Sequence, residues 1–329
     1  MKDEVFQHLS VLPRETLEAL EPRSGGLYLD MTLGGAGHAS LVLEQSGPDG
    51  KLYGTDRDGD AIRAAGERLK PFEGRFEIRR CPFADVSDWL GEGICDGVLM
   101  DLGISSPQVD WGHRGFSFMK MGNLDMRMDV GDQVTAADIV NTWSGDELIR
   151  IFRLYGEEPR ARRVAQAITE RRAVKPFETT LQLAECIETA LGRRGDKHHS
   201  ATRVFQALRM QVNDELGQLE RGLVAAWKVL KEHGKLVTIS FHSLEARMVK
   251  QFGNFWSLDY RAGDAMDTPA LRIPKQPCAR WLSRKAVKPS VEETRSNPRA
   301  RSAQLRTLIK LRALPAGEEM DWRTGKRFR

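Results

Sequence analysis

Residues 27–38 read LYLDMTLGGAGH, and this stretch decides the fold. Its first four residues form an apolar strand that ends on a carboxylate, Asp30, and a glycine-rich loop follows at 33–38. Residues 39–45 then have the pattern of a helix. Glycines between a strand and a helix let the backbone approach a ligand, and the free N–H groups at the helix start suit an anion.

The same arrangement recurs along the first hundred residues. Strands are expected at 51–55, 76–80 and 97–101, with a helix at 59–69. This alternation predicts an α/β fold with a mostly parallel, Rossmann-like sheet that carries helices on both faces. Asp56 and Asp101 stand at two further strand ends, so acidic side chains gather at the rim where open α/β sheets bind ligands.

The middle of the chain has a different pattern. From about residue 110 to residue 213 strand signals disappear, and helices are expected at 145–155, 159–172 and 179–191. The α/β pattern then resumes with a helix at 213–232 that ends at Gly234, a strand at 235–241, a loop-rich stretch at 263–298 and a strand at 305–311. We therefore expect a catalytic domain made of residues 1–110 and 214–329, interrupted by an all-helical substrate-recognition subdomain at 111–213.

Composition excludes several classes of protein. The 329 residues carry 50 Lys plus Arg against 46 Asp plus Glu, a net charge of +4. Residues 272–329 hold 16 basic and 5 acidic residues, a balance of +11, so the first 271 residues are left at −7 (4 minus 11). The 40% of apolar residues favour a folded core over disorder. No run reaches the roughly 18 apolar residues of a membrane span, and residues 1–8 contain no apolar signal segment.

Four cysteines, none of them in a CxxC pair, indicate single buried thiols in a reducing cytoplasm and predict no metal site. They are Cys81, Cys95, Cys186 and Cys278.

The glycine loop and Asp56 together favour a ribose-containing ligand, because an acid about 20 positions after the loop can accept hydrogen bonds from ribose hydroxyls. A dinucleotide fingerprint needs a third glycine, and Ser40 stands in that place. An adenosyl nucleoside with an amino-acid tail therefore fits better than a nicotinamide dinucleotide. The alternative is a tight turn followed by a solvated aspartate.

Residues 101–108, DLGISSPQ, follow the fourth strand, where amino-group methyltransferases commonly place an Asp, Asn or Ser followed by prolines. An exocyclic base amine is a weak nucleophile because its lone pair is delocalised into the ring. Acceptors for its N–H groups favour a pyramidal nitrogen and hold it in line with a sulfonium methyl, which is catalysis by positioning. The alternative is that Ser105, Ser106 and Pro107 only cap a turn.

Further motifs extend these signals over most of the chain. They are RGFSFM at 114–119, LDMRMD at 124–129, YGEE at 155–158, ATRVFQALR at 201–209, ISFHSLE at 239–245 and NPRARS at 297–302. With residues 30–38 and 101–110, this set resembles the ribosomal RNA small-subunit methyltransferase H family, also called MraW. The resemblance implies a class I methyltransferase fold and S-adenosylmethionine as cofactor. It also implies methyl transfer to N4 of a cytidine in the decoding region of small-subunit ribosomal RNA, in an assembled or nearly assembled subunit. A cytoplasmic location and a possible homodimer follow from the same likeness.

The resemblance also implies roles for single residues. Cofactor contacts are expected from Ala36, Gly37, His38, Asp56 (ribose), Phe83 (adenine), Asp101 and Gln108. From their place after the fourth strand, and not from the resemblance, we expect Asp101, Ser105 and Ser106 to position the cytosine amine. From the basic excess of residues 272–329 we expect Arg299 and Arg301 to contact RNA. The family usually has Gly where this chain has Ala36, and Ser where it has Ala39, which puts the loop contacts in question.

Two other classes of protein remain as alternatives. A nicotinamide-dependent oxidoreductase would share the sheet but would leave the serines after Asp101 without a role. A catalytically inert RNA-binding protein would explain the basic segment but would not need carboxylates on neighbouring strand ends. Trp111, Trp143, Trp256 and Trp281 are candidates for base stacking or for packing, and His242 with Glu245 for catalysis or for shaping the cleft.

Overall fold

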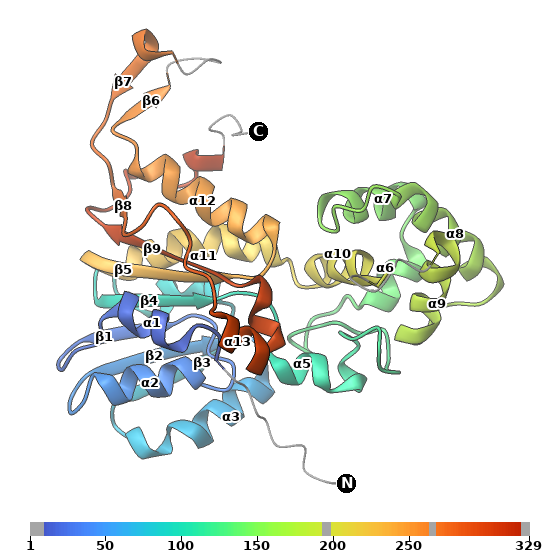
Figure 1. The fold of residues 1–329 in the computed structure, drawn as a ribbon, viewed down its shortest axis with the longest axis horizontal. Coiled ribbons are helices and arrows are strands. Elements are labelled where there is room, and N and C mark those ends of the chain that lie inside the picture. Colours follow the sequence, from blue (N-terminus) through green and yellow to red (C-terminus); the bar gives the residue numbers. More distant parts are fainter. Residues whose placement is uncertain (1–9, 193–198, 263–267, 324–329) are drawn as a thin grey trace. The chain divides into compact units, whose positions relative to one another are not determined.

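A seven-stranded sheet forms the centre of the larger part of the computed structural model, which describes residues 10–192, 199–262 and 268–323. Its strand order is β3-β2-β1-β4-β5-β9-β8 (Figure 1). Neighbours from β3 to β5 are parallel, and β9 is antiparallel to both β5 and β8. This confirms the predicted mostly parallel sheet. The strands are β1 Leu27–Asp30, β2 Lys51–Asp56, β3 Phe76–Arg80, β4 Cys95–Asp101, β5 Leu230–Ser240, β8 Ala279–Trp281 and β9 Gln304–Lys310.

Helices cover both faces of the sheet, and the alternation of side chains along the central strands explains why. On β4, Val98 and Met100 point into the core shared with α11 and α12, whereas Leu99 points into the core shared with α1, α2 and α3. A strand buried on both faces reads as a continuous apolar run, which is how this stretch appears in the sequence. The helices of this part are α1 Pro13–Leu20, α2 Gly37–Gln45, α3 Gly59–Leu69, α4 Val86–Trp89, α11 Glu215–Val229, α12 Ser243–Ser257 and α13 Val291–Ser296.

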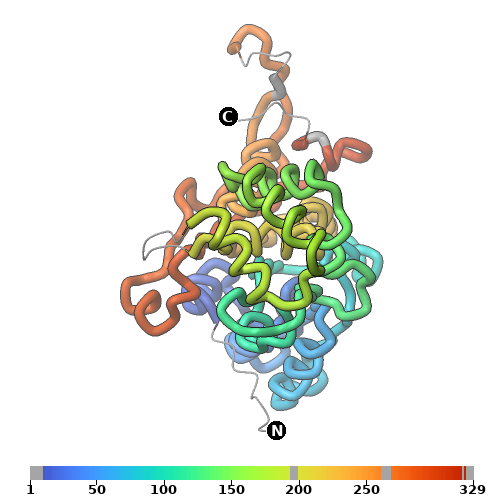
Figure 2. The backbone as a smooth tube through the Cα atoms, turned by 90° about the vertical axis from the view of Figure 1, so that its right-hand side faces the viewer, coloured from blue at the N-terminus to red at the C-terminus, as the bar shows by residue number. Residues whose placement is uncertain are grey.

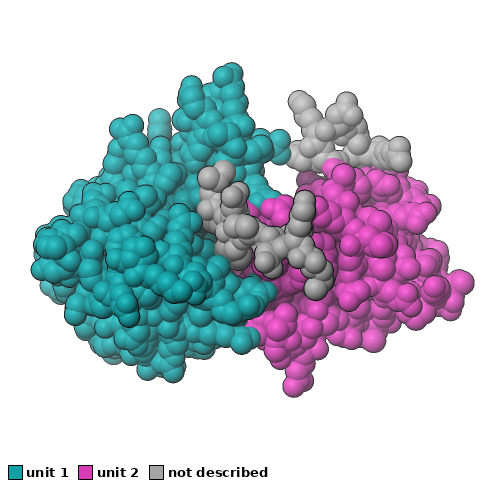
Figure 3. Space-filling model, turned by 90° about the horizontal axis from the view of Figure 1, so that it is seen from below, with its two compact units in different colours: residues 1–103, 217–329 teal, residues 104–216 magenta. Residues whose placement is uncertain are grey.

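Two compact units make up the chain. Unit 1 is Met1–Gly103 with Gly217–Arg329, and unit 2 is Ile104–Leu216 (Figure 3). The sequence placed these two boundaries at 110/111 and 213/214, slightly inside unit 2 as the structure delimits it. The catalytic and substrate-recognition roles of the two parts stay a prediction.

Unit 2 is built from helices around its own apolar core, which includes Phe152 and Phe177. Several of these helices begin at a side chain that caps the first turn: Thr135, Ser144 and Thr179 accept hydrogen bonds from backbone N–H groups three residues later. The helices are α5 Ser106–Asp110, α6 Ala136–Thr142, α7 Gly145–Leu154, α8 Ala161–Val174, α9 Thr180–Leu191 and α10 Thr202–Val212.

The predicted helix at 213–232, with Gly234 as its end, is wrong at its carboxyl end. Helix α11 stops at Val229 and β5 begins at Leu230. Buried Lys310 explains the early stop, because its Nζ donates to the carbonyls of Trp227 and Leu230, each at 2.6 Å, at the end of the helix. Burial lowers the pKa of this lysine, which the two carbonyls hold in place.

A two-stranded ribbon extends from unit 1 as a separate arm (Figure 2). It consists of β6 Tyr260–Ala262 and β7 Arg272–Pro274, and the guanidinium of Arg272 lies 4.0 Å from the centre of the Tyr260 ring. In its described part, the stretch predicted as loop-rich, 263–298, contains only short elements, namely the 3₁₀ turn Pro269–Leu271, β7, β8 and α13. Residues 263–267 lie outside the described residues.

Candidate active site at the carboxyl ends of β1, β2 and β4

Three aspartates end three neighbouring strands. Asp30 ends β1, Asp56 ends β2 and Asp101 ends β4, and β1 lies between the other two strands in the sheet. Asp30 pairs with Gly54 and with Leu99, so Asp56 and Asp101 each stand two residues farther along their strands. Asp30 is buried, and the other two are partly buried. The structure thus brings together the acidic rim that the strand pattern predicted.

Asp30 lies at the base of a chain of hydrogen bonds. Its Oδ1 accepts from the backbone N–H of Thr32 at 3.1 Å, and the Thr32 hydroxyl accepts from the backbone N–H of Asp101 at 2.6 Å. Burial raises the pKa of Asp30 to about 6, while the charge of His38 opposes the rise. Sequence reasoning assigned no role to Asp30 or Thr32, although Asp30 carries the same strand-end signal as the other two aspartates.

Replacing Asp30 by Asn is expected to stabilise the protein at neutral pH. The folded-state pKa of Asp30 lies above its unfolded value, so the protonated form favours folding and that advantage is lost as pH rises from about 4 to above 6. Asp30→Asn removes the buried charge. The free energy of unfolding of the variant should therefore exceed that of the wild type by an amount that grows over this pH range to about 3 kcal/mol. Urea unfolding at a series of pH values measures it, and a gain that is constant with pH would contradict the assignment.

Asp56 holds the glycine-rich loop. Its Oδ2 accepts from the backbone N–H of Gly34 at 2.8 Å, and its Oδ1 accepts from that of Asp58 at 2.9 Å. Burial raises the pKa of Asp56 to about 6, against the effect of these two hydrogen bonds. The side chain therefore has a loop-anchoring role in addition to the ligand contact predicted from its spacing.

The loop itself is shaped by two residues with positive φ. Gly34 has φ +48°, and Ala36, which precedes α2, has φ +56°. A left-handed alanine costs about 1–3 kcal/mol relative to glycine. Ala36 is completely buried in the core under α2, and that packing holds the conformation. Gly37 is needed for a different reason, since a Cβ there would stand 2.1 Å from the Ser10 hydroxyl.

His38 on α2 faces Asp101. The ring Nε2 lies 3.6 Å from Asp101 Oδ2, and the two side chains are 5% and 11% exposed. Burial lowers the pKa of His38, but the nearby carboxylate of Asp101, with the charge of Asp30, raises it overall above its usual value. Asp101 Oδ1 and His38 Nε2 are buried atoms without a hydrogen-bond partner. A buried acceptor left without a donor is unusual, and here it stands at a strand end that the sequence marks as functional.

Phe83 stands just after β3, in the short 3₁₀ turn Phe83–Asp85. It packs against α11 at Gly222, where a Cβ would stand 2.5 Å from the ring. The Met100 side chain also lies next to that position. The ring is only partly buried, which is compatible with the adenine contact that the resemblance implies.

Ser105, Ser106 and Gln108 belong to unit 2, whereas the other predicted cofactor residues belong to unit 1. Ser105 precedes α5, and its backbone N–H donates to Gln108 Oε1 at 3.0 Å, while Ser106 and Gln108 are buried. Ser105 is the N-cap of α5 and forms a capping box with Gln108, so the capping alternative describes the structural role of Ser105.

Arg299 and Arg301 are exposed on the 3₁₀ segment Pro298–Ser302, with Ala300 fully buried between them. Ala300 belongs to the same core cluster as Ala36 of the glycine-rich loop. Glu293 of α13 also accepts a hydrogen bond from the backbone N–H of Leu12 at 2.6 Å, 281 residues away in sequence. The basic segment is thus part of the fold's framework, with its two arginines directed outward.

The structure places four further candidates in unit 1. His242 and Glu245 close the first turn of α12, with the N–H of Phe241 donating to Glu245 Oε2 at 2.8 Å. Trp256 is buried, and the Trp281 indole donates to Asn254 at 3.1 Å.

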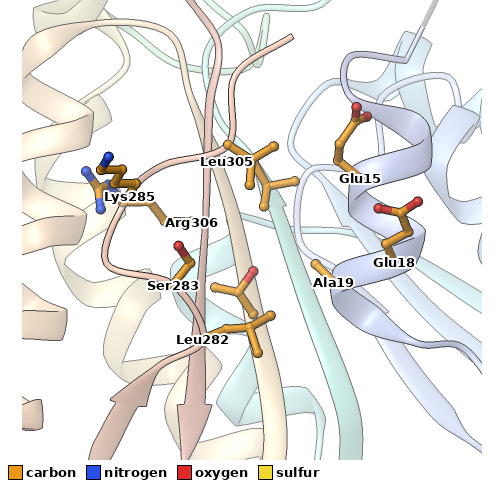
Figure 4. Close-up of a pocket in the computed structure, with 10 residues that line it drawn as sticks. Glu15, Glu18, Ala19, Leu282, Ser283, Lys285, Leu305 and Arg306 are labelled. Atoms are coloured by element: carbon orange, nitrogen blue, oxygen red, sulfur yellow. The ribbon is translucent and has the colours of Figure 1, made fainter. Parts of the chain in front are cut away.

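A cavity of about 170 Å³ lies between α1 and the β8–β9 region (Figure 4). Glu15 and Glu18 line one side, and Lys285 and Arg306 line the other. None of the predicted site residues contributes to its walls.

Among the helices formed by the described part of the chain, none combines the length and apolar character that a membrane crossing requires.

Known proteins that resemble this chain include two sequence relatives and one solved structure. A ribosomal RNA small subunit methyltransferase H from Symbiobacterium thermophilum is 49% identical over 319 residues, which cover 95% of this chain and 99% of that protein. The protein of the same name from Syntrophotalea carbinolica is 48% identical over 316 residues, covering 94% and 100%. A solved rRNA methylase from Streptococcus thermophilus aligns with a TM-score of 0.36 at 11% identity, over 91% of this chain and 94% of that one.

The sheet, with its parallel strands β3-β2-β1-β4-β5 followed by antiparallel β9, is that of the Rossmann-like class I methyltransferases. The model of the MraW methylase family matches residues 5–311. From this match and the two relatives that align along almost their whole length, the chain belongs to the MraW methylase family.

Proposed function

We propose that this rRNA methyltransferase transfers a methyl group to N4 of a cytidine in the decoding region of small-subunit ribosomal RNA. The observation that carries the proposal is the buried, unpartnered Oδ1 of Asp101 at the carboxyl end of β4. An exocyclic amine offers the N–H donor that this acceptor lacks, whereas a carbon nucleophile would offer none. In the cell, we place this activity in the cytoplasm, on an assembled or nearly assembled small subunit.

S-adenosylmethionine is the expected cofactor of a methylase of this family, and the residues of unit 1 fit it. Gly34 leaves the loop open, since a Cβ there would meet only the Thr32 carbonyl, at 3.9 Å. Asp56 retains lone pairs for ribose hydroxyls beyond those that the loop uses. Asp30, Asp56 and Asp101 place negative charge near the site, which suits a ligand with a sulfonium and an ammonium group.

The cofactor supplies an electrophilic methyl group on a positively charged sulfur. The chain would supply position: Ala36 and Gly37 would line the amino-acid end, Asp56 would hold the ribose, and Phe83 and Gln108 would border the base. Asp101 accepts an N–H of the cytosine amine, which favours a pyramidal nitrogen with an available lone pair. Ser105 and Ser106 follow Asp101 by four and five residues in the chain, and we assign them to the same amine.

Arg299 and Arg301 are proposed to contact RNA phosphates. Each phosphate contact releases about one counterion, so replacing both arginines by Gln should reduce the slope of the logarithm of RNA affinity against the logarithm of salt concentration by about two. The RNA concentration needed for the half-maximal rate should rise. S-adenosylmethionine affinity should stay unchanged, since both side chains are exposed. Lys51→Gln, an exposed charge at the amino end of β2, is the matched control. An unchanged salt slope, or a loss of cofactor binding, would remove the assignment.

Two measurements test the proposal. Calorimetry should detect binding of S-adenosylmethionine and none of NAD, and the reverse result would favour the oxidoreductase alternative. Transfer of a labelled methyl group should then be compared between small subunits and protein-free rRNA. Labelling of the protein-free RNA alone would contradict the assembled subunit as substrate, and labelling of neither would favour an inert RNA-binding protein.

A further inference from the structure

His38 and Asp101 form a buried pair in which the second carboxylate oxygen of Asp101, Oδ1, has no hydrogen-bond partner among the residues that the structure describes. The 3.6 Å between His38 Nε2 and Asp101 Oδ2 joins α2 to the end of β4, and both side chains are almost completely buried. Asp101 Oδ1 has no hydrogen-bond donor within the described structure. Leaving a buried acceptor unsatisfied costs about 1–3 kcal/mol, so an arrangement of this kind is maintained for a reason other than stability.

The charged groups around His38 favour its protonated form. Asp101 of β4 and Asp30 of β1 both act on the ring, and a hydrogen bond to the Val11 backbone adds to their effect. Against these, burial and the amino-terminal position on α2 disfavour the charge. Arg68 of α3 also approaches, with Nη1 3.9 Å from where a Cβ on Gly37 would stand. The acidic groups outweigh the others, so the pKa of His38 is raised above its usual 6.5.

We propose that His38, as an imidazolium, is a positioning residue that holds Asp101 through Oδ2 with Oδ1 left toward the substrate amine, and that Asp101 Oδ1 takes the proton that N4 loses. This inference rests on the proposed function and adds to it the fate of that proton. It also gives His38 a role different from the cofactor contact implied by the family resemblance.

Methyl transfer to N4 is followed by loss of one N4 proton to Asp101. The N4 lone pair forms the new bond to the methyl carbon, and the carbon–sulfur bond breaks with its electron pair left on sulfur. N4 is then positively charged and strongly acidic, so an N–H bond breaks, its electron pair returns to nitrogen, and the proton moves to Asp101 Oδ1. Asp101 returns the proton to water after the product leaves.

Protonation of His38 should determine how the rate of methyl transfer falls at alkaline pH. His38 must be protonated, so the rate of methyl transfer at saturating substrates should fall as pH rises through the raised pKa of His38. His38→Gln keeps a polar group of similar length but cannot carry the charge. We expect it to lower the single-turnover rate about tenfold or more and to abolish the alkaline fall. The dissociation constant of S-adenosylmethionine should stay within about threefold.

The matched control is His233→Gln, which replaces an exposed histidine on β5 and should leave both rate and profile unchanged. The experiment begins by identifying the wild-type product. If that product is not N4-methylcytidine, the proposed function fails, whereas an N4 product with an unchanged alkaline fall in His38→Gln overturns only the inference. A loss of cofactor affinity equal to the loss of rate would make His38 a cofactor contact and would equally overturn it.

A second measurement does not depend on activity or on the folding of a His38 variant. The imidazole of His38 in the wild-type protein, followed by nuclear magnetic resonance, should titrate above its usual 6.5, and the pKa should drop in Asp101→Asn. A pKa at or below 6.5, or one that does not respond to Asp101→Asn, contradicts the pair. The double variant His38→Gln with Asp101→Asn should be no slower than Asp101→Asn alone, because the two residues act as a unit.

Discussion

Asp101→Asn is expected to slow methyl transfer at saturating substrates by about 10²-fold or more, which makes it the most damaging conservative change in this chain. The substitution preserves size and leaves the backbone N–H of Asp101 bonded to Thr32. It removes the charge that pairs with His38, and the amide cannot take a proton from N4 under these conditions. Single-turnover transfer from labelled S-adenosylmethionine to small subunits measures the effect.

Cofactor affinity separates this role from a purely binding role. For Asp101→Asn we expect the dissociation constant of S-adenosylmethionine, measured by calorimetry, to change far less than the rate. If Asp101→Asn transfers methyl at the wild-type rate when it is saturated with S-adenosylmethionine and small subunits, Asp101 only binds the cofactor. The melting temperature serves as the control for folding.

Asp56→Ala is expected to have the second-largest effect, on binding rather than on rate. It removes a carboxylate that would accept two hydrogen bonds from ribose hydroxyls, and bonds of this charged kind contribute about 1.5–3 kcal/mol each. It also frees the N–H of Gly34, so the glycine-rich loop loses its anchor. Together these losses should weaken S-adenosylmethionine binding by about 10²-fold or more.

The pH dependence of cofactor binding gives an independent check on Asp56. Its pKa of about 6 means that the carboxylate is ionised above that value, so affinity should fall as pH drops through 6. Asp56→Asn keeps an acceptor for Gly34 and should show a smaller loss at neutral pH than Asp56→Ala, with a weaker acid dependence. Equal affinities for all three proteins across this range would place the ribose elsewhere.

The fold was largely predictable because its signals are local. Residues 27–38 specify strand, loop and helix within twelve positions, and the alternation of strands and helices then implies a parallel sheet. The end of α11 was not predictable in this way. Gly234 is a sound local stop signal, but the helix stops five residues earlier, at Val229, where Lys310 from the distant strand β9 binds its last carbonyls. A contact across 80 residues leaves no trace in the local pattern.

The candidate site was also predictable where its signals are local, and not where its geometry depends on contacts between distant residues. The strand pattern predicted the gathering of Asp30, Asp56 and Asp101, because carboxyl ends of parallel strands share one edge. It did not predict that Asp56 holds Gly34, nor that His38 faces Asp101, since both depend on how the loop folds back over the strand ends. The support of the basic segment by Glu293 and Leu12 was likewise invisible, and only the burial of Ala300 shows that the segment is framework as well as surface.

The identity of the methylated nucleoside tests most directly whether the protein methylates N4 of a cytidine. Small subunits should be incubated with the protein and S-adenosylmethionine carrying a labelled methyl group, and their rRNA digested to nucleosides and separated. The label should co-migrate with N4-methylcytidine, and it should disappear with Asp101→Asn. Label on a ring carbon, on the ribose or on adenosine would contradict the proposal that the orphaned acceptor at the end of β4 receives a cytosine amine.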